Sequence, residues 1–397
     1  MDTQKQNRRN WLKNSALSLA GLAFMPQDTW ARAIDIAQKN NSTFVFNTNQ
    51  SFNEFTPPFF KDEEKLNAIL RANENPYGPP PKSAAAFQKE VFTGNRYAWK
   101  TLFDLRDKIA KKENVASDQI IMAPGSSDIL EKVAMVLYQK GGNVISADPS
   151  YMSLMNVSKA VGGEWKSYKL LDDAQHDLDA MEAGIDENTK LVYICNPNNP
   201  TGSVTNADKL REFCSRVSEK VPVFVDEAYI ELSNNGLKDS MVDLVSQGKN
   251  VMIARTFSKI HGMAGLRIGY LVGKKETLDQ INDVTRGGMG ITAPSIAAAS
   301  TSMDHQDFLD MTKQKITEAR NYTIDYLKSK AYPFLPSETN FIIFEIPMDG
   351  KQFLEKIYSK KVAVRAFSFW DKNWCRVSIG TMKEMEFFTQ AMDEIFV

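Results

Sequence analysis

The stretch VMIARTFSKIHGMAGLRIGYLVG, residues 251–273, decides how the rest of this sequence is interpreted. An apolar, strand-like run, Val251 to Ala254, enters a polar turn that carries Ser258 and Lys259, and a glycine-rich segment then leads to Arg267. Burying a charged lysine at the end of a strand destabilises the fold, unless the ammonium is paired or its pKa is lowered. Because a lowered pKa leaves the amine neutral, such a lysine becomes a nucleophile.

Arg267 adds the second half of the pattern, since a planar, permanently charged guanidinium suits a dianionic phosphate. An amine nucleophile beside a phosphate clamp is what a phosphorylated aldehyde cofactor requires, and pyridoxal 5′-phosphate is the common one. The alternative is a surface lysine and arginine on a loop, so the remaining sequence has to decide between the two interpretations.

Composition narrows the function classes. The chain has 397 residues, of which 43% are hydrophobic and 24% are charged, so it has ordinary globular composition. A net charge of -1 gives no electrostatic reason to expect nucleic acid or stable membrane association. The three histidines have no ligand-like spacing, so no metal site is expected, and the three cysteines offer no disulfide framework.

The N-terminal residues have the pattern of a targeting signal. Arg8-Arg9-Asn10-Trp11-Leu12-Lys13 precedes a short apolar run, and Ala31-Arg32-Ala33 supplies a small-x-small cleavage pattern. Residues 1–33 resemble a twin-arginine export signal, which predicts a periplasmic protein. An ordinary amphipathic helix on a cytoplasmic protein is the alternative. Residues 34–60 show no sustained period and are predicted to be a linker or arm.

Four apolar runs in the middle of the chain predict an α/β fold. Each lacks polar alternation, as is typical of parallel strands covered on both faces, and each is followed by polar residues. Ligands bind at the carboxyl edge of such sheets, so those polar residues are expected to form one site. The runs are Val144 to Ala147, Leu191 to Cys195, Val221 to Val225 and Val251 to Ala254.

A further turn, Pro124-Gly125-Ser126-Ser127-Asp128, precedes an apolar helical pattern. Such a turn can bind an anion through backbone N–H groups and hydroxyls at a helix N-terminus, although a plain helix cap has the same sequence. Residues 93–299 are predicted to be a large cofactor-binding domain with a mostly parallel sheet between helices. Residues 61–92 with 300–397 are predicted to be a small α+β domain.

Taken together, these motifs resemble the fold type I pyridoxal-phosphate enzymes, specifically the class I/II aminotransferases and their histidinol-phosphate aminotransferase-like branch. The matching motifs occur in family order after about Lys61: Asn-Glu-Asn-Pro-Tyr-Gly (73–78), Asn-Pro-Asn-Asn-Pro-Thr-Gly (196–202), Val-Asp-Glu-Ala-Tyr (225–229) and Ser-Lys-x-x-Gly-Met-Ala-Gly-Leu-Arg-Ile-Gly-Tyr (258–270). The family follows the position of Tyr97 with Pro-Asp-Pro or similar, whereas this chain has Ala98-Trp99-Lys100, which puts the substrate in doubt.

The resemblance implies a role for each matching residue. Lys259 would bind the cofactor aldehyde and then act as base and acid, and Asp226 would pair with the pyridinium nitrogen. Tyr229 would donate a hydrogen bond to the ring hydroxyl oxygen. Tyr97 would reach the phosphate of the neighbouring subunit, which implies a homodimer. The cofactor-binding set is completed by Ser126, Ser127, Tyr151, Asn199, Ser258 and Arg267, and the substrate-binding set is Asn75, Tyr77, Arg365 and Arg376.

The resemblance implies an aminotransferase that moves an amino group from an amino acid, or from a histidinol-phosphate-like amine, to a 2-oxo acid. A decarboxylase or lyase of the same fold is an alternative, because the same lysine, aspartate and phosphate clamp serve several reactions. A non-catalytic amine-binding module is a third, although a binder gains nothing from a desolvated nucleophile.

Overall fold

The structure is a computed structural model, and it describes residues 52–59 and 63–396. The predicted signal, residues 1–33, lies outside the described residues, as does most of the predicted arm. Residues 50–397 cluster as one compact unit. Among the described residues, no helix is long and apolar enough to cross a bilayer.

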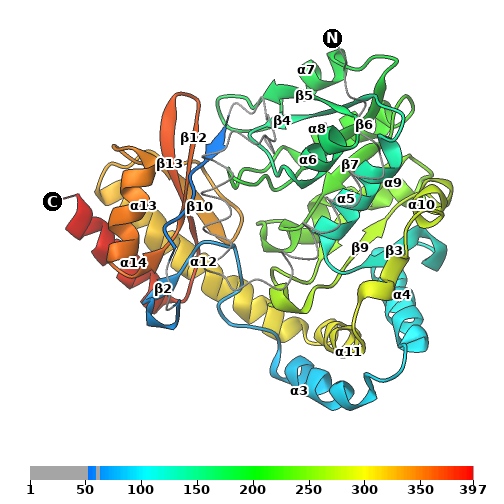
Figure 1. The fold of residues 1–397 in the computed structure, drawn as a ribbon, viewed down its shortest axis with the longest axis horizontal. Coiled ribbons are helices and arrows are strands. Elements are labelled where there is room, and N and C mark those ends of the chain that lie inside the picture. The colour runs from blue at the N-terminus through cyan, green and yellow to red at the C-terminus, as the bar shows by residue number, and fades with distance from the viewer. Residues whose placement is uncertain (1–51, 60–62, 397) are drawn as a thin grey trace, which may run out of the picture. The chain divides into compact units, whose positions relative to one another are not determined.

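Within the described residues, a seven-stranded sheet forms the centre of the fold (Figure 1). Its strands lie in the order β3-β9-β8-β7-β6-β4-β5, and all run in one direction except β9, which is antiparallel to both of its neighbours. The mostly parallel sheet predicted from the sequence is therefore confirmed. The strands are β3 (Ile120–Ala123), β4 (Asn143–Asp148), β5 (Glu164–Lys169), β6 (Thr189–Cys195), β7 (Val223–Asp226), β8 (Val251–Thr256) and β9 (Gly269–Val272).

Helices cover both faces of this sheet, which explains why its central strands are apolar throughout. Alternate residues of one strand enter different cores: Val223 and Val225 pack with α4, α8 and α11, whereas Phe224 packs with α5, α6 and α10. The helices of this part are α3 (Pro81–Glu90), α4 (Trp99–Glu113), α5 (Ser126–Leu137), α6 (Ser153–Ala160), α7 (Leu178–Ala183), α8 (Ala207–Val217), α9 (Asp243–Ser246), α10 (Lys275–Asn282) and α11 (Ala293–Ser302).

A second, antiparallel sheet has the order β1-β12-β13-β10 and packs with the C-terminal helices (Figure 1). The long helix α12 (Gln306–Ser329) runs from the end of α11 to this sheet (Figure 1). The elements are β1 (Asn53–Glu54), β10 (Phe341–Glu345), β12 (Arg365–Phe369), β13 (Lys372–Ser378), α13 (Gly350–Ser359) and α14 (Met382–Ile395), with a separate parallel pair of β2 (Ala68–Ile69) and β11 (Val362–Ala363).

Local sequence signals set the ends of these helices. Thr381 and Glu384 form a capping box at the start of α14, and the Asp349 carboxylate accepts from backbone N–H groups at the start of α13. Helix α4 ends at Asn114, which adopts a left-handed conformation at φ 55°.

The domain boundaries stay a prediction. The sequence interpretation placed α3 in the small domain, and in the structure α3 packs against α11.

Candidate active site

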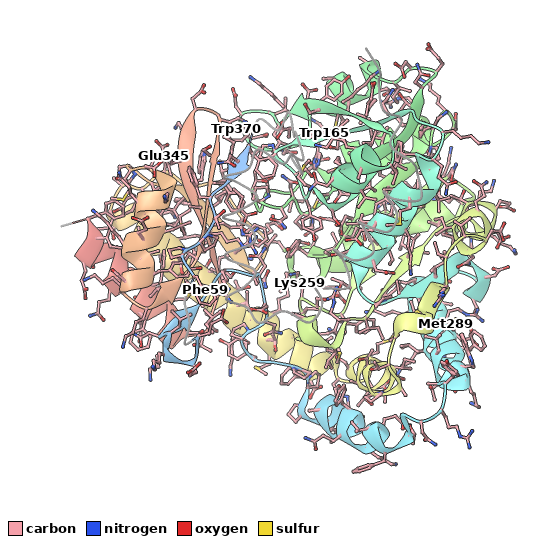
Figure 2. All side chains as sticks on the ribbon, in the orientation of Figure 1. Phe59, Trp165, Lys259, Met289, Glu345 and Trp370 are labelled. Atoms are coloured by element: carbon pink, nitrogen blue, oxygen red, sulfur yellow. The ribbon has the colours of Figure 1, made fainter. Side chains whose placement is uncertain are left out.

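A cavity of about 590 Å³ opens where the carboxyl ends of the parallel strands face the second sheet. It receives most of the residues that the sequence predicted, and Lys259 lies between the two sheets (Figure 2). The predicted residues that line it are Ser126, Ser127, Tyr151, Asn199, Asp226, Tyr229, Ser258, Lys259, Arg267, Arg365 and Arg376. The four strand ends therefore do deliver their polar residues to one place.

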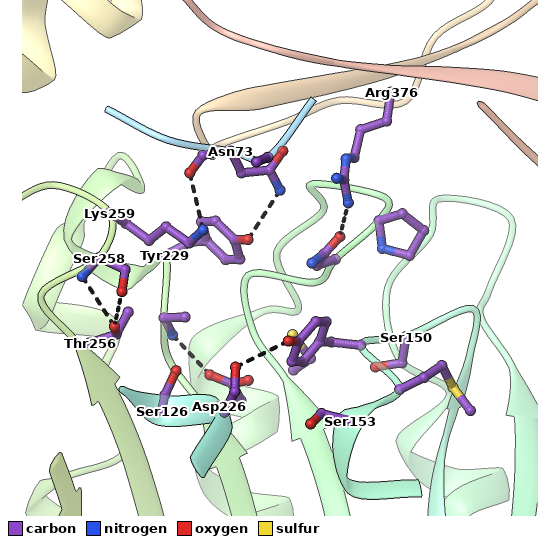
Figure 3. A pocket seen from close by; sticks show the side chains of 18 of the residues that line it. Asn73, Ser126, Ser150, Ser153, Asp226, Tyr229, Thr256, Ser258, Lys259 and Arg376 are labelled. Atoms are coloured by element: carbon purple, nitrogen blue, oxygen red, sulfur yellow. Dashed lines mark hydrogen bonds between the residues drawn. The ribbon is translucent and has the colours of Figure 1, made fainter. Parts of the chain in front are cut away.

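Lys259 is held in the loop that follows β8. Its Nζ atom donates a hydrogen bond of 3.1 Å to the carbonyl oxygen of Asn73 and lies 5.3 Å from the centre of the Tyr229 ring (Figure 3). Burial lowers the pKa of Lys259 to about 8, and the positive charges of Arg376 and Arg267 act in the same direction. With this pKa, about a tenth of the amine is neutral at pH 7, far more than for an ordinary lysine, and the neutral form is what a nucleophile and base requires.

Asp226 ends β7 and lies below Lys259 in the cavity (Figure 3). Its carboxylate accepts from the Tyr193 hydroxyl at 3.1 Å and from the backbone N–H of Ala228 at 3.2 Å. Burial raises the pKa of Asp226 to about 6 despite these donors. A buried carboxylate of this kind gains stability from a cationic partner, which a protonated pyridine nitrogen would provide.

An anion cradle forms at the start of α5. Gly125 precedes the helix at φ 94°, and a Cβ atom there would lie 2.3 Å from Nη2 of Arg267. Arg267 also donates from Nη1 to Ser258 Oγ at 3.3 Å and to the Ala264 carbonyl at 3.0 Å. Backbone N–H groups, the hydroxyls of Ser126 and Ser258 and one guanidinium thus converge, which is the donor set that a phosphate prefers.

Tyr151 and Ser127 meet beside this cradle, with their hydroxyl oxygens 3.1 Å apart. Tyr151 lines the cavity next to Asp226, where an aromatic ring can stack on a planar ligand. Burial raises the pKa of the Tyr151 hydroxyl, so it stays protonated and remains a hydrogen-bond donor at neutral pH.

Arg376 lies on β13 and is buried (Figure 3). It donates from Nη1 to Asn199 Oδ1 at 2.7 Å and from Nη2 to the Arg71 carbonyl at 3.1 Å, whereas its Nε has no partner among the residues that the structure describes. Burial lowers the pKa of Arg376 to about 10, so the guanidinium stays charged at neutral pH. Because the oxygen of Asn199 is occupied by Arg376, its amide nitrogen is the group left to donate to a bound ring.

The structure places three predicted site residues away from this cavity. Tyr97 is 78% exposed, between α3 and α4. Asn75 is buried, donating to the Ile260 carbonyl at 2.8 Å and accepting from the Tyr77 N–H at 3.0 Å. Tyr77 lies under the amine of Lys315, 5.1 Å from its ring centre.

Asn73, which the sequence reasoning did not select, occupies the centre of the site (Figure 3). Its side chain donates to the Tyr229 hydroxyl at 3.1 Å and accepts from the Ser378 hydroxyl at 2.9 Å, and its carbonyl accepts from Lys259. It adopts a left-handed conformation at φ 52°, which asparagine tolerates better than most residues. That tolerance was the available signal, inside a motif from which Asn75 was chosen instead.

Phe52 and Glu54 were also missed, because they belong to the segment interpreted as an arm. Residues 53 and 54 form β1, which pairs with β12, and both Phe52 and Glu54 line the cavity. The alternation of Phe52, Asn53, Glu54 and Phe55 was the signal for a strand, but it is too short to stand out from its surroundings.

A lysine with a lowered pKa, a buried acid and a phosphate cradle at the carboxyl edge of this sheet together define a pyridoxal-phosphate enzyme of fold type I. Comparison with known sequences agrees, because the profile of the family described as aminotransferase class I and II matches residues 67–392. The chain belongs to that family, and it is a pyridoxal-phosphate-dependent aminotransferase.

Individual relatives give the same result. Histidinol-phosphate aminotransferase 2 of Pseudomonas aeruginosa is 32% identical over 327 residues, covering 82% of this chain and 88% of that protein. The histidinol-phosphate aminotransferase of Caldicellulosiruptor saccharolyticus is 30% identical over 82% of this chain and 91% of its own length. The crystal structure of histidinol-phosphate aminotransferase from Sinorhizobium meliloti in complex with pyridoxal-5′-phosphate matches with a TM-score of 0.76 and 25% identity, over 89% of this chain and 98% of that chain.

The residues of this chain fit that cofactor. Residue 125 is a glycine, and a side chain there would collide with the guanidinium of Arg267. The anion cradle is therefore open to a ligand because this position has no side chain. The buried Asp226 carboxylate lacks a cationic hydrogen-bond partner among the described residues, and the Lys259 amine points into the same cavity. Phosphate, ring nitrogen and aldehyde thus each have a matching group.

Proposed function

We propose that the enzyme takes the amino group of an amino acid, or of a histidinol-phosphate-like amine, and delivers it to a 2-oxo acid. The observation that carries this proposal is the shared cavity, in which the Lys259 amine, with a pKa near 8, faces the buried guanidinium of Arg376. A donor whose carboxylate binds Arg376 would present its amino group and its Cα–H bond to the same part of the cavity as Lys259.

Pyridoxal phosphate, when bound, supplies an aldehyde carbon for the amine and an electron-withdrawing ring. The protein residues supply the rest. Lys259 would remove a proton from the donor Cα and later give it back, which requires the amine to change between its neutral and protonated forms near neutral pH. Asp226 would hold the ring nitrogen protonated, and the hydroxyls and N–H groups of the cradle would fix the phosphate.

Arg376 binds the donor carboxylate through one Nη group and through its Nε, which has no partner within residues 52–59 and 63–396, and the same site serves the carboxylate of the 2-oxo acid. Tyr229 has a hydroxyl that accepts from Asn73, and burial raises its pKa, so its own hydrogen is available to donate to the ring oxygen. Histidinol phosphate is a candidate donor because the relatives described above are named for it.

We further infer a homodimer. Exposed apolar side chains gather around a groove between α4, β3 and residues 282–289; its lining includes Trp99, Leu102, Phe103 and Met289. Tyr97, Trp99 and Phe103 form a continuous aromatic row with ring centres 6.2 Å apart. An apolar surface of this kind favours a protein partner, and a second copy would bring Tyr97 to the phosphate cradle of its neighbour.

We also propose that the enzyme is exported to the periplasm, because residues 1–33 resemble a twin-arginine signal. This route carries folded proteins, which suits an enzyme that acquires its cofactor before export. A fusion of residues 1–33 to a reporter that is active only after folded export tests it. The matched control replaces Arg8 and Arg9 with lysine, and equal export of both fusions would contradict the proposal.

A half-reaction screen tests the reaction itself. The yellow holoenzyme is mixed with single amino acids and with histidinol phosphate, and the loss of its visible absorbance is followed without any acceptor. Loss of colour with recovery after addition of 2-oxoglutarate supports amino transfer. Carbon dioxide release without amino transfer would replace the proposal by a decarboxylase, and no response to any donor would overturn it.

The dimer is tested by light scattering and by complementation. Two variants are mixed after partial unfolding and refolding: Tyr97→Asp, whose carboxylate would repel a phosphate in the neighbour's cradle, and Lys259→Ala, which lacks the reactive amine. If Tyr97 completes the neighbour's site, hybrids carry one site with both native residues, and up to about a quarter of wild-type activity returns. A monomer in solution, or no recovery by hybrids, would contradict the inferred arrangement.

A further inference from the structure

Three neighbouring strands of the four-stranded sheet each bring one charged side chain to the cavity. Glu54 lies on β1, Arg365 on β12 and Arg376 on β13, and all three line the cavity. Arg365 and Arg376 are direct partners across the β12–β13 ladder, whereas Glu54 pairs with Phe367, two residues along from Arg365. A carboxylate and two guanidinium groups thus share one face of this sheet.

The two arginines repel each other, because like charges directly opposite in an antiparallel pair are unfavourable. Glu54 offsets this repulsion, since its Oε1 accepts a hydrogen bond of 2.5 Å from Nη1 of Arg365. The three groups also act on one another: after burial and the effect of Tyr229, Arg365 lowers the pKa of Arg376 and Glu54 raises it. The group of three carries a net charge of +1.

The position of Glu54 is set by the strand that carries it. The Phe55 N–H donates to the Ala366 carbonyl at 3.0 Å, so β1 is fixed to β12 by its main chain. Side chains alternate along it: Phe52 and Glu54 face the cavity, and Phe55 packs over Gly350, where an added Cβ would lie 2.3 Å from the ring. Phe52 and Phe55 therefore anchor Glu54 from both sides.

We propose that Glu54 determines donor specificity by occupying Arg365, so that the site accepts a single anionic group and an uncharged side chain. This inference rests on the proposed amino transfer. Arg376 then remains as the cation for one carboxylate, and Phe52 and Phe367 provide apolar walls beside it. A second anionic group on the donor has to displace Glu54 or lie beside it, and Glu74 adds another acid to the lining.

The proposal narrows the donor class. Aromatic and other neutral amino acids are preferred, and aspartate, which carries a second carboxylate, is disfavoured although Arg365 is present. In the wild-type enzyme, the second-order rate constant for loss of holoenzyme colour should be larger with phenylalanine than with aspartate. Glu54→Gln should raise the ratio of the aspartate constant to the phenylalanine constant about tenfold, the effect of one charge pair.

Two further variants separate this effect from a general change in charge. Glu345→Gln removes a carboxylate that pairs with Lys372 on the same sheet but lies away from Lys259 (Figure 2), and the ratio should not change. In the double variant Glu54→Gln/Arg365→Gln, the gain should disappear, because the freed guanidinium is what attracts the anion.

Binding of unreactive analogues gives a readout independent of turnover. Isothermal titration of the holoenzyme should show tighter binding of 3-phenylpropanoate than of maleate, and Glu54→Gln should shift this preference toward maleate. If the wild-type enzyme already prefers aspartate, or if Glu54→Gln leaves the ratio unchanged, the proposal is wrong while amino transfer stands. If no donor reacts, amino transfer itself fails.

Discussion

The Nζ atom of Lys259 lies 3.1 Å from the carbonyl oxygen of Asn73, a residue 186 positions earlier in the chain. The same carbonyl accepts from Asn340 at 2.9 Å, so one backbone group connects the catalytic amine to the second sheet. The side chain of Asn73 meanwhile donates to Tyr229. Asn73 therefore positions two residues of the site, one through its main chain and one through its side chain.

Replacing Asn73 with glycine separates these two functions. Asn73→Gly keeps the carbonyl, the backbone N–H that donates to Ser378 Oγ, and tolerance of φ 52°, but it removes the side-chain hydrogen bonds to Tyr229 and Ser378. We expect the holoenzyme to form and kcat to fall roughly tenfold, with a loss of about 1 to 2 kcal/mol in the free energy of unfolding. Steady-state kinetics and urea unfolding measure these effects. Tyr229→Phe alone should lower kcat comparably, and unchanged kcat in Asn73→Gly would contradict the assigned role.

The pKa of Lys259 makes cofactor capture depend on pH. Because burial lowers this pKa to about 8, the neutral amine increases about tenfold per pH unit below that value and levels off above it. The rate at which the apoenzyme attaches pyridoxal phosphate covalently should follow the same curve, measured by timed borohydride reduction and the amount of cofactor fixed to Lys259. Lys259→Ala should bind the cofactor without becoming labelled in this way and lose at least about a thousandfold in turnover. A plateau reached only above pH 10 would indicate an unperturbed lysine.

Asp226 gives a stability prediction of defined sign. Burial raises its pKa from 3.8 to about 6 in the cofactor-free protein, so its contribution to stability is full below pH 3.8 and is lost as the pH rises through 6. An asparagine at position 226 cannot ionise, so the Asp226→Asn variant avoids this loss, which is on the order of 2 to 3 kcal/mol in the free energy of unfolding. The melting temperature of the variant apoenzyme relative to wild type should therefore increase between pH 4.5 and 7.5.

The holoenzyme should show the opposite ranking at pH 7.5, because the cofactor ring gives the Asp226 carboxylate a cationic partner that asparagine does not need. The cofactor should then stabilise the wild type more than Asp226→Asn. Equal stabilisation of both proteins by the cofactor would mean that Asp226 does not pair with the ring nitrogen.

The cradle can be tested at a single backbone position. Gly125→Ala places a Cβ atom 2.3 Å from Nη2 of Arg267 at φ 94°, so Arg267 has to move. We expect cofactor affinity to fall at least about tenfold, measured by equilibrium titration of the apoenzyme. Gly248→Ala is the matched control, because it has φ 78° but no atom within 4 Å of the added Cβ. If both substitutions weaken binding equally, backbone strain and not the cradle is responsible.

Much of this site could be predicted because it depends on strand ends. Lys259, Asp226 and Asn199 each follow an apolar run, and a parallel sheet necessarily brings its carboxyl ends to one edge. Arg267 could be predicted for a related reason: it precedes β9, which returns antiparallel to β8 and so brings it back beside Ser258. The strand ends follow from the local pattern, whereas the place of Arg267 depends on the antiparallel pairing of β8 with β9, and the role of Asn199 was implied only by the family resemblance.

The residues that were missed depend on long-range contacts. Glu54 enters the site only because a two-residue strand pairs with β12, more than 300 positions away, and such a short strand has no measurable period. Asn73 and Asn75 occur in one turn-rich motif, and which of them faces the cavity depends on Ser378 and Ile260, which are remote in sequence. Neither choice can be made from the motif itself.

The pairing of β8 with β9 has one more consequence. Because Thr256 and Gly269 are partners across this ladder, the loop between them is closed at its base, and the reactive amine and the arginine that it carries are held at a set separation. The hairpin therefore sets the distance between the group that binds the aldehyde and the group that binds the phosphate. An analogue of the vitamin B6 coenzyme with one extra methylene between ring and phosphate would be too long to satisfy both ends, however well its ring stacks.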